Sequence, residues 1–87
     1  YDLRSAGPGG ERHIEVKGTT KTRFTFCWLE PAEEDCRKND PSFWLYLVTE
    51  VESEEPKVWE FDRARLAQRF DRVVPHYHFK FPKTDFQ

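Results

Sequence analysis

The strongest folding signal in the sequence is the apolar run SFWLYLVTEV at residues 42–51. A continuous apolar run of this length is typical of a β-strand that is covered on both faces. We therefore expect residues 42–51 to form the central, most buried strand of a sheet. A chain of 87 residues has room for one small domain around such a strand, and an aromatic fraction of 16% supplies large side chains for its core.

Shorter strands are indicated on the N-terminal side of this run. Residues 1–5 and 13–17 flank the turn sequence AGPGGE, which favours an antiparallel hairpin. Residues 22–29 (TRFTFCWL) alternate in polarity and predict a third strand joined to the hairpin. The alternation places three aromatic side chains on one face of that strand: Phe24, Phe26 and Trp28.

Two helices are expected in the rest of the chain. Residues 30–41 (EPAEEDCRKNDP) carry a proline suited to the first turn, then acidic residues, then basic residues, an order that complements the helix dipole. Asp62 is a good N-cap for a second helix over residues 63–70. The apolar face of that helix would hold Leu66, Ala67, Phe70 and Val74.

Two more strands, at residues 57–61 (KVWEF) and 76–81 (HYHFKF), complete a β-β-β-α-β-β-α-β order. This order indicates one α/β (α+β) domain over residues 1–87, with a mixed β-sheet and flanking helices. The strands before the first helix are expected to be antiparallel, and the strand after it to join the sheet in parallel. The residues after 81 read as a tail. Because the chain has no methionine, we expect it to be a fragment of a larger protein.

The net charge of −2 conceals a strong segregation. Residues 1–27 carry +2, residues 28–62 carry −8 and residues 63–87 carry +4. A basic-acidic-basic order can place a positive surface beside an acidic one, which leaves room for a polyanionic partner but excludes a generic basic nucleic-acid coat. No apolar run is long enough to span a membrane and no signal-peptide pattern is present, so a targeting segment, if one exists, lies outside this piece. We expect an intracellular protein, either cytoplasmic or nuclear.

Three sets of residues carry both a functional and a structural interpretation. Arginines 65, 69 and 72 could follow a phosphate backbone, but a solvated helix face is favoured. His76 and His78 could bind a metal, but a polar sheet face is favoured, because no third ligand is evident. The three tryptophans could stack on bases, but core positions are favoured in so small a domain; they are Trp28, Trp44 and Trp59.

The two cysteines, Cys27 and Cys36, have no neighbouring residues at zinc-binding spacing. One disulfide between them would close a short loop. Two free thiols are the commoner state in an intracellular domain, and we expect that state here.

The segment IEVKG at the end of the second strand carries the strongest functional signal. Residues i and i+2 of a strand share a face about 6–7 Å apart, so Glu15 and Lys17 lie side by side. The Glu15 carboxylate and the Val16 carbonyl can bind Mg²⁺, which usually takes one or two carboxylates together with water and phosphate oxygens. Asp2, on the partner strand of the hairpin, is the second acid. Together, Asp2, Glu15 and Lys17 could polarise a phosphodiester and activate water. A Glu-x-Lys pair is, however, most often part of an ordinary solvated strand face.

The segments YDLRS (residues 1–5) and IEVKGT (residues 14–19), followed by an aromatic strand and a helix, resemble the PD-(D/E)XK nuclease superfamily. More narrowly, the chain resembles the C-terminal domain of the plant protein NO VEIN, a DUF3883-type domain. This resemblance implies a restriction-endonuclease-like core without its first helix and a Mg²⁺- or Mn²⁺-dependent nuclease acting on DNA. It also implies that Asp2 and Glu15 are metal ligands, Lys17 is the catalytic lysine and Glu30 is an accessory catalytic residue.

The expected function is therefore hydrolysis of DNA phosphodiester bonds by one module of a restriction or DNA-processing protein. The partners would be DNA, the remainder of the parent chain and, as an option left open, a second copy in a homodimer. The alternative is a catalytically inactive nuclease-like module that binds nucleic acid or protein. A third interpretation, an unrelated β-rich interaction module, requires Asp2 and Glu15 to lie far apart.

Overall fold

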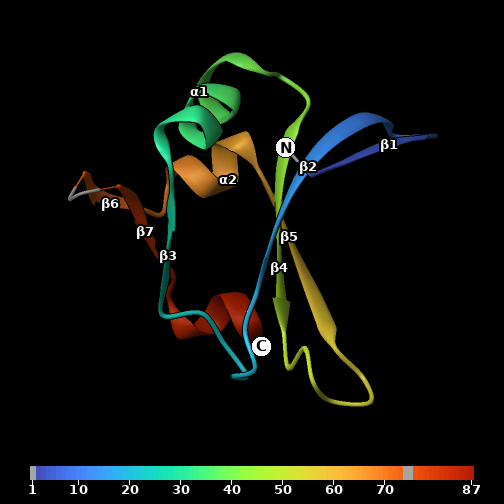
Figure 1. Ribbon diagram of the computed structural model, residues 1–87, viewed down its shortest axis with the longest axis vertical. Coiled ribbons are helices and arrows are strands. Elements are labelled where there is room, and N and C mark those ends of the chain that lie inside the picture. Colours follow the sequence, from blue (N-terminus) through green and yellow to red (C-terminus); the bar gives the residue numbers. More distant parts are fainter. Residues whose placement is uncertain (1, 74–75) are drawn as a thin grey trace.

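The computed structural model describes residues 2–73 and 76–87 and contains two β-sheets (Figure 1). The first sheet is mixed and has four strands, in the spatial order β1 (Leu3–Gly7), β2 (Gly10–Gly18), β4 (Phe43–Thr49) and β5 (Lys57–Asp62). The second sheet is antiparallel and has three strands, in the order β3 (Phe26–Leu29), β7 (Tyr77–Lys80) and β6 (Phe70–Val73).

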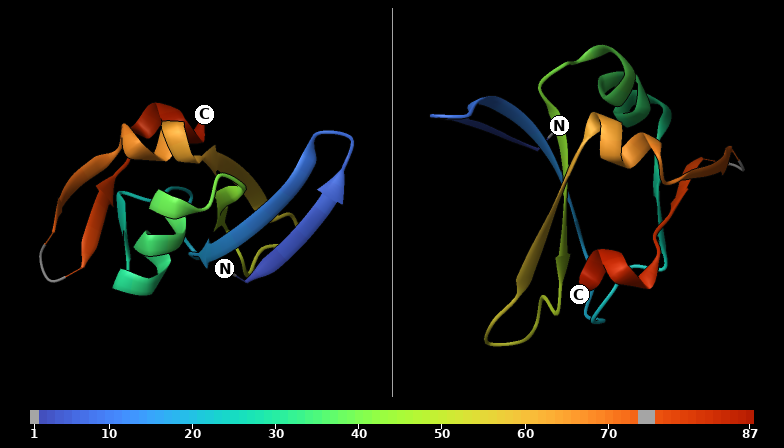
Figure 2. Two further views of the ribbon diagram at one scale, coloured as in Figure 1. Left: turned by 90° about the horizontal axis from the view of Figure 1, so that it is seen from above. Right: turned by 180° about the vertical axis from the view of Figure 1, so that it is seen from behind.

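Short helices close the space between the two sheets. Helices α1 (Pro31–Asn39) and α2 (Arg63–Ala67) lie at one end, and the 3₁₀-helix η1 (Lys83–Phe86) lies at the other (Figures 1 and 2). The β1–β2 hairpin extends away from this assembly. None of the helices in the described part of the chain is both long and apolar enough to cross a membrane.

The structure confirms the α+β class and the main features of the first sheet. β1 and β2 pair as an antiparallel hairpin, and β4 joins β2 in parallel. β4 is central, with its residues alternating between buried and half-buried. Asp62 caps α2 by accepting a hydrogen bond from the Arg65 amide at 2.8 Å, and Pro31 starts α1.

The core lies between the sheets and is built on the inner face of β4. Leu45 and Leu47 are fully buried there, together with Phe61 of β5. The second sheet supplies Leu29 and Phe79 to the same core. On the outer face of β4, the Arg12 guanidinium stacks 3.6 Å from the centre of the Trp44 ring, which covers that face with polar and aromatic groups.

The prediction that the third strand would continue the N-terminal hairpin is wrong. β3 pairs with β7 in the second sheet, and its register sets Cys27 opposite Phe79 and Leu29 opposite Tyr77. This pairing turns Cys27 and Leu29 inward and leaves Phe26 and Trp28 46% and 47% exposed. The face that carries Phe26 and Trp28 is therefore the outer face of the sheet, and the expectation that Trp28 belongs to the core is wrong. Phe24 is buried, but it precedes the strand.

The C-terminal region also differs from the prediction. The second helix ends at Ala67, which is exposed, and Phe70 begins β6. The Lys80 amide donates to the Arg69 carbonyl at 2.8 Å, so strand pairing replaces the helix directly after its short turn. Val74, expected on the same helical face, lies outside the described residues.

The expected tail is an ordered part of the core. Its residues form η1, with Asp85 buried and Phe86 packed against the core cluster. Asp85 receives hydrogen bonds from Arg69 at 2.7 and 2.8 Å and from Arg65 at 3.3 Å. The favoured interpretation of these arginines as one solvated helix face is therefore wrong. Arg65 and Arg69 bind Asp85, and Arg72 lies on β6, where it pairs with Asp71.

Candidate active site

The register of β2 decides where its polar residues point. Glu15 is paired with Leu45 and Lys17 with Leu47 in the parallel ladder, and paired residues of neighbouring strands share a face of the sheet. Glu15 and Lys17 therefore lie on the same side as the core leucines. Glu15 is only 5% exposed, which contradicts the interpretation of this strand face as ordinary and solvated.

Asp2 is held beside this part of β2 by two hydrogen bonds. Its amide donates to the Ile14 carbonyl at 2.7 Å, and its carboxylate accepts from the Val16 amide at 2.9 Å. Its charge and hydrogen bonding reach the Glu15 carboxyl. Asp2 and Glu15 are therefore neighbours, which contradicts the interpretation that required them to lie far apart.

Helix α1 adds a carboxylate that the sequence analysis did not select. The Glu33 carboxylate accepts hydrogen bonds from the Lys17 ammonium at 3.1 and 3.2 Å and interacts directly with the Glu15 carboxyl. It also accepts from the Glu30 amide at 2.9 Å, the back-bond of a helix capping box. The signal was present in the sequence, because Glu33 is the third helical residue after the N-cap position and Pro31 marks the helix start.

Glu30 has a different position from the residues expected to share its site. It is the N-cap of α1 and its side chain is exposed. The Lys17 ammonium is bound instead by Glu33 of the same helix. We use the name carboxylate-lysine cluster for the residues that do meet, which are Asp2, Glu15, Lys17 and Glu33.

The cluster has an excess of negative charge in a partly buried place. Burial raises the pKa of Glu15 to about 8, and the facing carboxylates of Glu33 and Asp2 contribute to the rise. For Glu33, burial opposes ionisation, but hydrogen bonds from the Glu30 amide, Glu15 and Lys17 outweigh it and lower the pKa. A proton on Glu15 shared with an ionised Glu33 is therefore the expected state near neutral pH when no cation is present.

This donor chemistry fits a hard divalent cation. Asp2 and Glu15 offer carboxylate oxygens, the Val16 carbonyl lies between them in sequence, and Mg²⁺ needs only one or two protein carboxylates beside water and substrate oxygens. Within residues 2–73 and 76–87, no group of three or more His, Cys, Asp and Glu side chains is placed to enclose a metal ion. The cluster fits an open site completed by solvent and substrate, and it does not fit a closed all-protein site.

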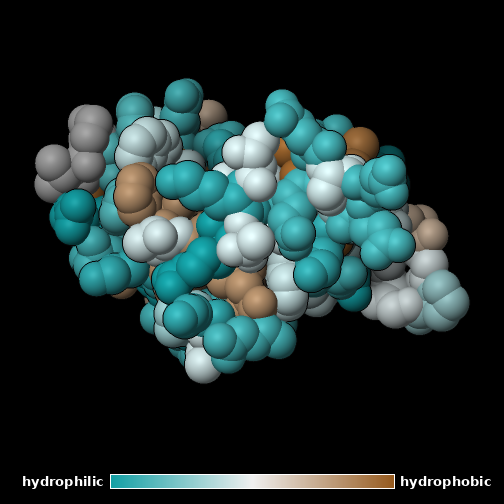
Figure 3. Space-filling view, turned by 90° about the horizontal axis from the view of Figure 1, so that it is seen from below, coloured by the Kyte–Doolittle hydropathy of each residue, from teal (hydrophilic) through white to brown (hydrophobic). Residues whose placement is uncertain are grey.

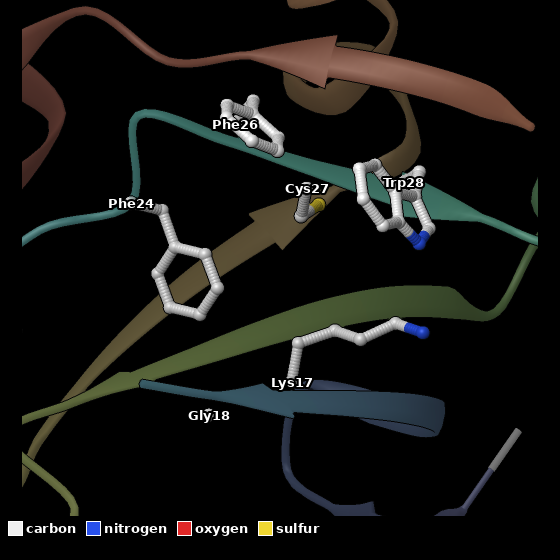
Figure 4. A pocket seen from close by; sticks show the side chains of 6 residues that line it. All are labelled: Lys17, Gly18, Phe24, Phe26, Cys27 and Trp28. Carbon is white, nitrogen blue, oxygen red and sulfur yellow. The ribbon is translucent and has the colours of Figure 1, made fainter. Parts of the chain in front are cut away.

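An open hollow of about 230 Å³ adjoins the cluster, between the end of β2 and β3. Lys17, Cys27 and Trp28 line it, together with Gly18, Phe24 and Phe26. In Figure 4 the Lys17 side chain extends towards Trp28, and Phe24 lies at the opposite end. Burial raises the pKa of the Cys27 thiol to about 12, which makes it a poor nucleophile at neutral pH.

Both cysteines are free, as expected. The imidazole of His78 is buried against the rings of Phe26 and Trp28, with ring centres 4.8 and 6.0 Å away. This aromatic packing differs from the polar sheet face that the sequence favoured for His78.

The fold and the cluster define a class of protein: a small α+β domain in which a β-hairpin and the first turn of a helix bring acidic residues and one lysine together. The family described as "Protein NO VEIN, C-terminal" matches residues 1–61, and the chain belongs to this family. The match includes the whole carboxylate-lysine cluster and confirms the narrower resemblance noted in the sequence. Membership of the PD-(D/E)XK superfamily stays a prediction. No curated protein and no solved structure matches the chain.

Proposed function

We infer that this domain is a metal-dependent nuclease module that hydrolyses DNA phosphodiester bonds. The observation that supports it best is the meeting of Asp2, Glu15, Glu33 and Lys17 from β1–β2 and α1, beside an open hollow. On this proposal the parent protein is an intracellular restriction or DNA-processing protein, and the PD-(D/E)XK resemblance describes its chemistry.

The residues of the cluster have separate tasks in this proposal. Asp2, Glu15 and the Val16 carbonyl would hold Mg²⁺ or Mn²⁺, which when bound polarises a phosphate and lowers the pKa of a water molecule. The Lys17 ammonium places a positive charge where negative charge develops on the phosphate. Glu33 orients Lys17 through its two hydrogen bonds.

The test is cleavage of a supercoiled plasmid by the intact protein with Mg²⁺, with Mn²⁺ and with chelator. Lys17→Ala and Asp2→Ala should each lower the metal-dependent rate by about 10²–10³-fold, the usual loss when one electrostatic group is removed from such a site. Lys57→Ala is the matched control, because Lys57 is exposed on β5 and pairs with Glu50 instead of the cluster. Unchanged cleavage by Lys17→Ala would refute the assignment.

A second candidate is a nuclease-like module that binds nucleic acid or protein without turnover. It is favoured by one observation: without a cation, Glu15 retains its proton near neutral pH and Lys17 is bound to Glu33. This candidate predicts binding that does not change in Asp2→Ala and no cleavage of any substrate with either metal. Metal-dependent cleavage that is lost in Asp2→Ala would exclude it.

A further inference from the structure

We propose that the outer face of the second sheet binds single-stranded nucleic acid, with bases stacked on Phe26 and Trp28. We call this face the β3–β7 platform, and its aromatic residues are Phe26, Trp28 and His78. The proposal rests on the proposed function only in taking nucleic acid as the ligand. It adds that the nucleic acid is single-stranded and that this sheet face would hold the strand next to the carboxylate-lysine cluster.

The platform presents the exposed rings of Phe26 and Trp28 over the buried ring of His78, and none of the three belongs to the core cluster. The Phe26 and Trp28 rings stack with centres 5.6 Å apart and planes inclined by 27°, and His78 stacks 4.8 Å from Phe26. The alternation of β3 sends Cys27 and Leu29 inward, so both larger rings stay about half exposed. Exposed rings held in a nearly parallel array match the faces of successive bases.

The surroundings of the platform have the charge that a phosphate backbone needs. Phe26 lies where three open hollows of about 230, 220 and 240 Å³ meet. Five basic side chains and one acidic side chain line these hollows; they are Lys17, Lys21, Arg23, Arg72, Lys80 and Asp71. In a chain with a net charge of −2, such a concentration of positive charge is a local feature of the surroundings of Phe26.

Two of these cations are available to a ligand. Within the described part of the chain, the Lys21 and Lys80 ammonium groups make no ion pair. Lys80 lies opposite Phe26 in the β3–β7 register, so it projects from the same face. Arg72 lies opposite His78 on β6 and adds a guanidinium to that face, where it pairs with Asp71.

The position of Lys17 connects the platform to the proposed active site. Lys17 lines the same hollow as Phe26 and Trp28, and it contacts Glu33 of the cluster. Figure 3 shows the molecule from below, where its surface is largely hydrophilic with apolar atoms in small patches. Because Lys17 shares a hollow with both rings, a strand stacked on the platform would place a phosphate near Lys17.

The geometry favours a single strand over a duplex. In a duplex each base face is already covered by its neighbours, and exposing one costs unstacking and unpairing. In a single strand the faces are free, and side-chain stacking tolerates any base. The platform is therefore expected to bind without sequence preference.

The experiment measures binding of the intact protein to fluorescein-labelled dT12 by anisotropy, in chelator so that no cleavage occurs. A 12-base-pair duplex and rU12 are compared in parallel. We expect dT12 to bind at least tenfold more tightly than the duplex. Equal or tighter binding of the duplex would overturn the proposal, and rU12 decides whether the platform distinguishes DNA from RNA.

Matched variants test the stacking itself. Phe26→Ala and Trp28→Ala should each weaken dT12 binding by roughly 5- to 150-fold, the loss that corresponds to one base stack. Trp28→Phe should retain most of the affinity. Phe70→Ala is the control, because Phe70 is similarly exposed (43%) and lies opposite Phe79, on the other face of the same sheet. Unchanged binding by both alanine variants, with circular dichroism confirming that they fold, would refute the platform.

A charge variant gives an independent measurement. Lys80→Gln should reduce the slope of log affinity against log salt by about 0.7, the value for one phosphate contact to a single strand. Lys57→Gln should leave the slope unchanged. The two proposals fail separately: cleavage without dT12 binding would overturn the platform alone, and dT12 binding without cleavage would overturn the nuclease alone.

Discussion

At the scale of single residues, Glu15 is the most informative side chain. In the folded protein its pKa is raised to about 8 from an ordinary value of 4.5, first by burial and then by Glu33. Between these two pH values the Glu15 carboxyl binds more protons in the folded state than in the unfolded state. Its contribution to stability is therefore fully present below about pH 4.5 and is lost as the pH rises through about 8.

The first prediction concerns this pH dependence. In chelator, the free energy of unfolding should fall by a few kcal/mol between pH 5 and pH 8.5, and Glu15→Gln should remove most of that fall. Urea denaturation at four pH values measures it. Addition of Mg²⁺ at pH 8 should restore stability to the unsubstituted protein, since a cation at the cluster favours the ionised carboxylate. An identical pH profile in Glu15→Gln would show that this carboxyl does not titrate as described.

The second prediction separates the charge of Glu33 from its capping role. Glu33→Gln retains an oxygen that can accept from the Glu30 amide but removes the negative charge beside Glu15. The pKa of Glu15 should therefore fall, and the loss of stability should begin at lower pH. Glu33→Ala should also cost about 1 kcal/mol through the lost helix cap. A pH profile of Glu33→Gln equal to that of the unsubstituted protein would argue that Glu33 acts on α1 alone.

At the scale of elements, β4 organises the molecule. It is hydrogen-bonded on both sides, by β2 in parallel and β5 in antiparallel, and its inner face forms the floor of the core. The same register places Glu15 and Lys17 of β2 next to Leu45 and Leu47. The cluster therefore depends on an element that contributes no residue to it.

The third prediction follows from this position. Leu47→Ala should lower the free energy of unfolding by about 2–5 kcal/mol, because it removes a fully buried side chain and leaves a cavity. Leu3→Ala is the control of the same type, since Leu3 on β1 is 55% exposed, and its effect should stay within about 0.5 kcal/mol. Chemical denaturation of both variants gives the comparison, and similar losses would contradict the described core.

At the scale of the whole molecule, the C-terminal residues complete a core that the family match does not include. The match ends at residue 61, but Leu66, Phe79 and Phe81 are core members with 0–1% exposure. β3 has its only strand partner among the described residues, β7, in the same C-terminal region. The N-terminal part therefore has an incomplete second sheet without them.

The fourth prediction tests this dependence. A fragment of residues 1–61 should show no cooperative unfolding transition, because it lacks β6 and β7 of the second sheet and their buried side chains. In the full chain, Asp85→Asn should lower stability by about 1.5–3 kcal/mol at pH 7, since Asp85 accepts charged hydrogen bonds from Arg69 and Arg65. A sharp urea transition in the fragment would contradict the prediction.

Arg69 and then Arg65 also lower the pKa of Asp85, which gives its contribution a definite pH range. A lowered carboxyl pKa stabilises the fold above the unfolded value of 3.8 and loses that effect as the pH falls through the folded value. The Asp85→Asn difference should therefore disappear in strongly acidic solution.

Local patterns were sufficient for the features that depend on neighbours in sequence. The hairpin with its glycine turn, the central apolar strand, the cap at Asp62 and the pairing of Glu15 with Lys17 on one strand face all follow from short-range propensity and period. These features are carried by interactions between residues that are close along the chain.

Long-range pairing determined the rest. The alternation of side chains along β3 indicates that Phe26 and Cys27 point in opposite directions. Only the pairing with β7 determines which of them faces the core. The approach of α1 to β2 selects Glu33 over Glu30, and the salt bridges of Asp85 convert an apparent tail into a covering element. In each case, several arrangements satisfy the local pattern equally well. Contacts between distant segments make one of them more stable than the others, because that arrangement buries the most apolar surface.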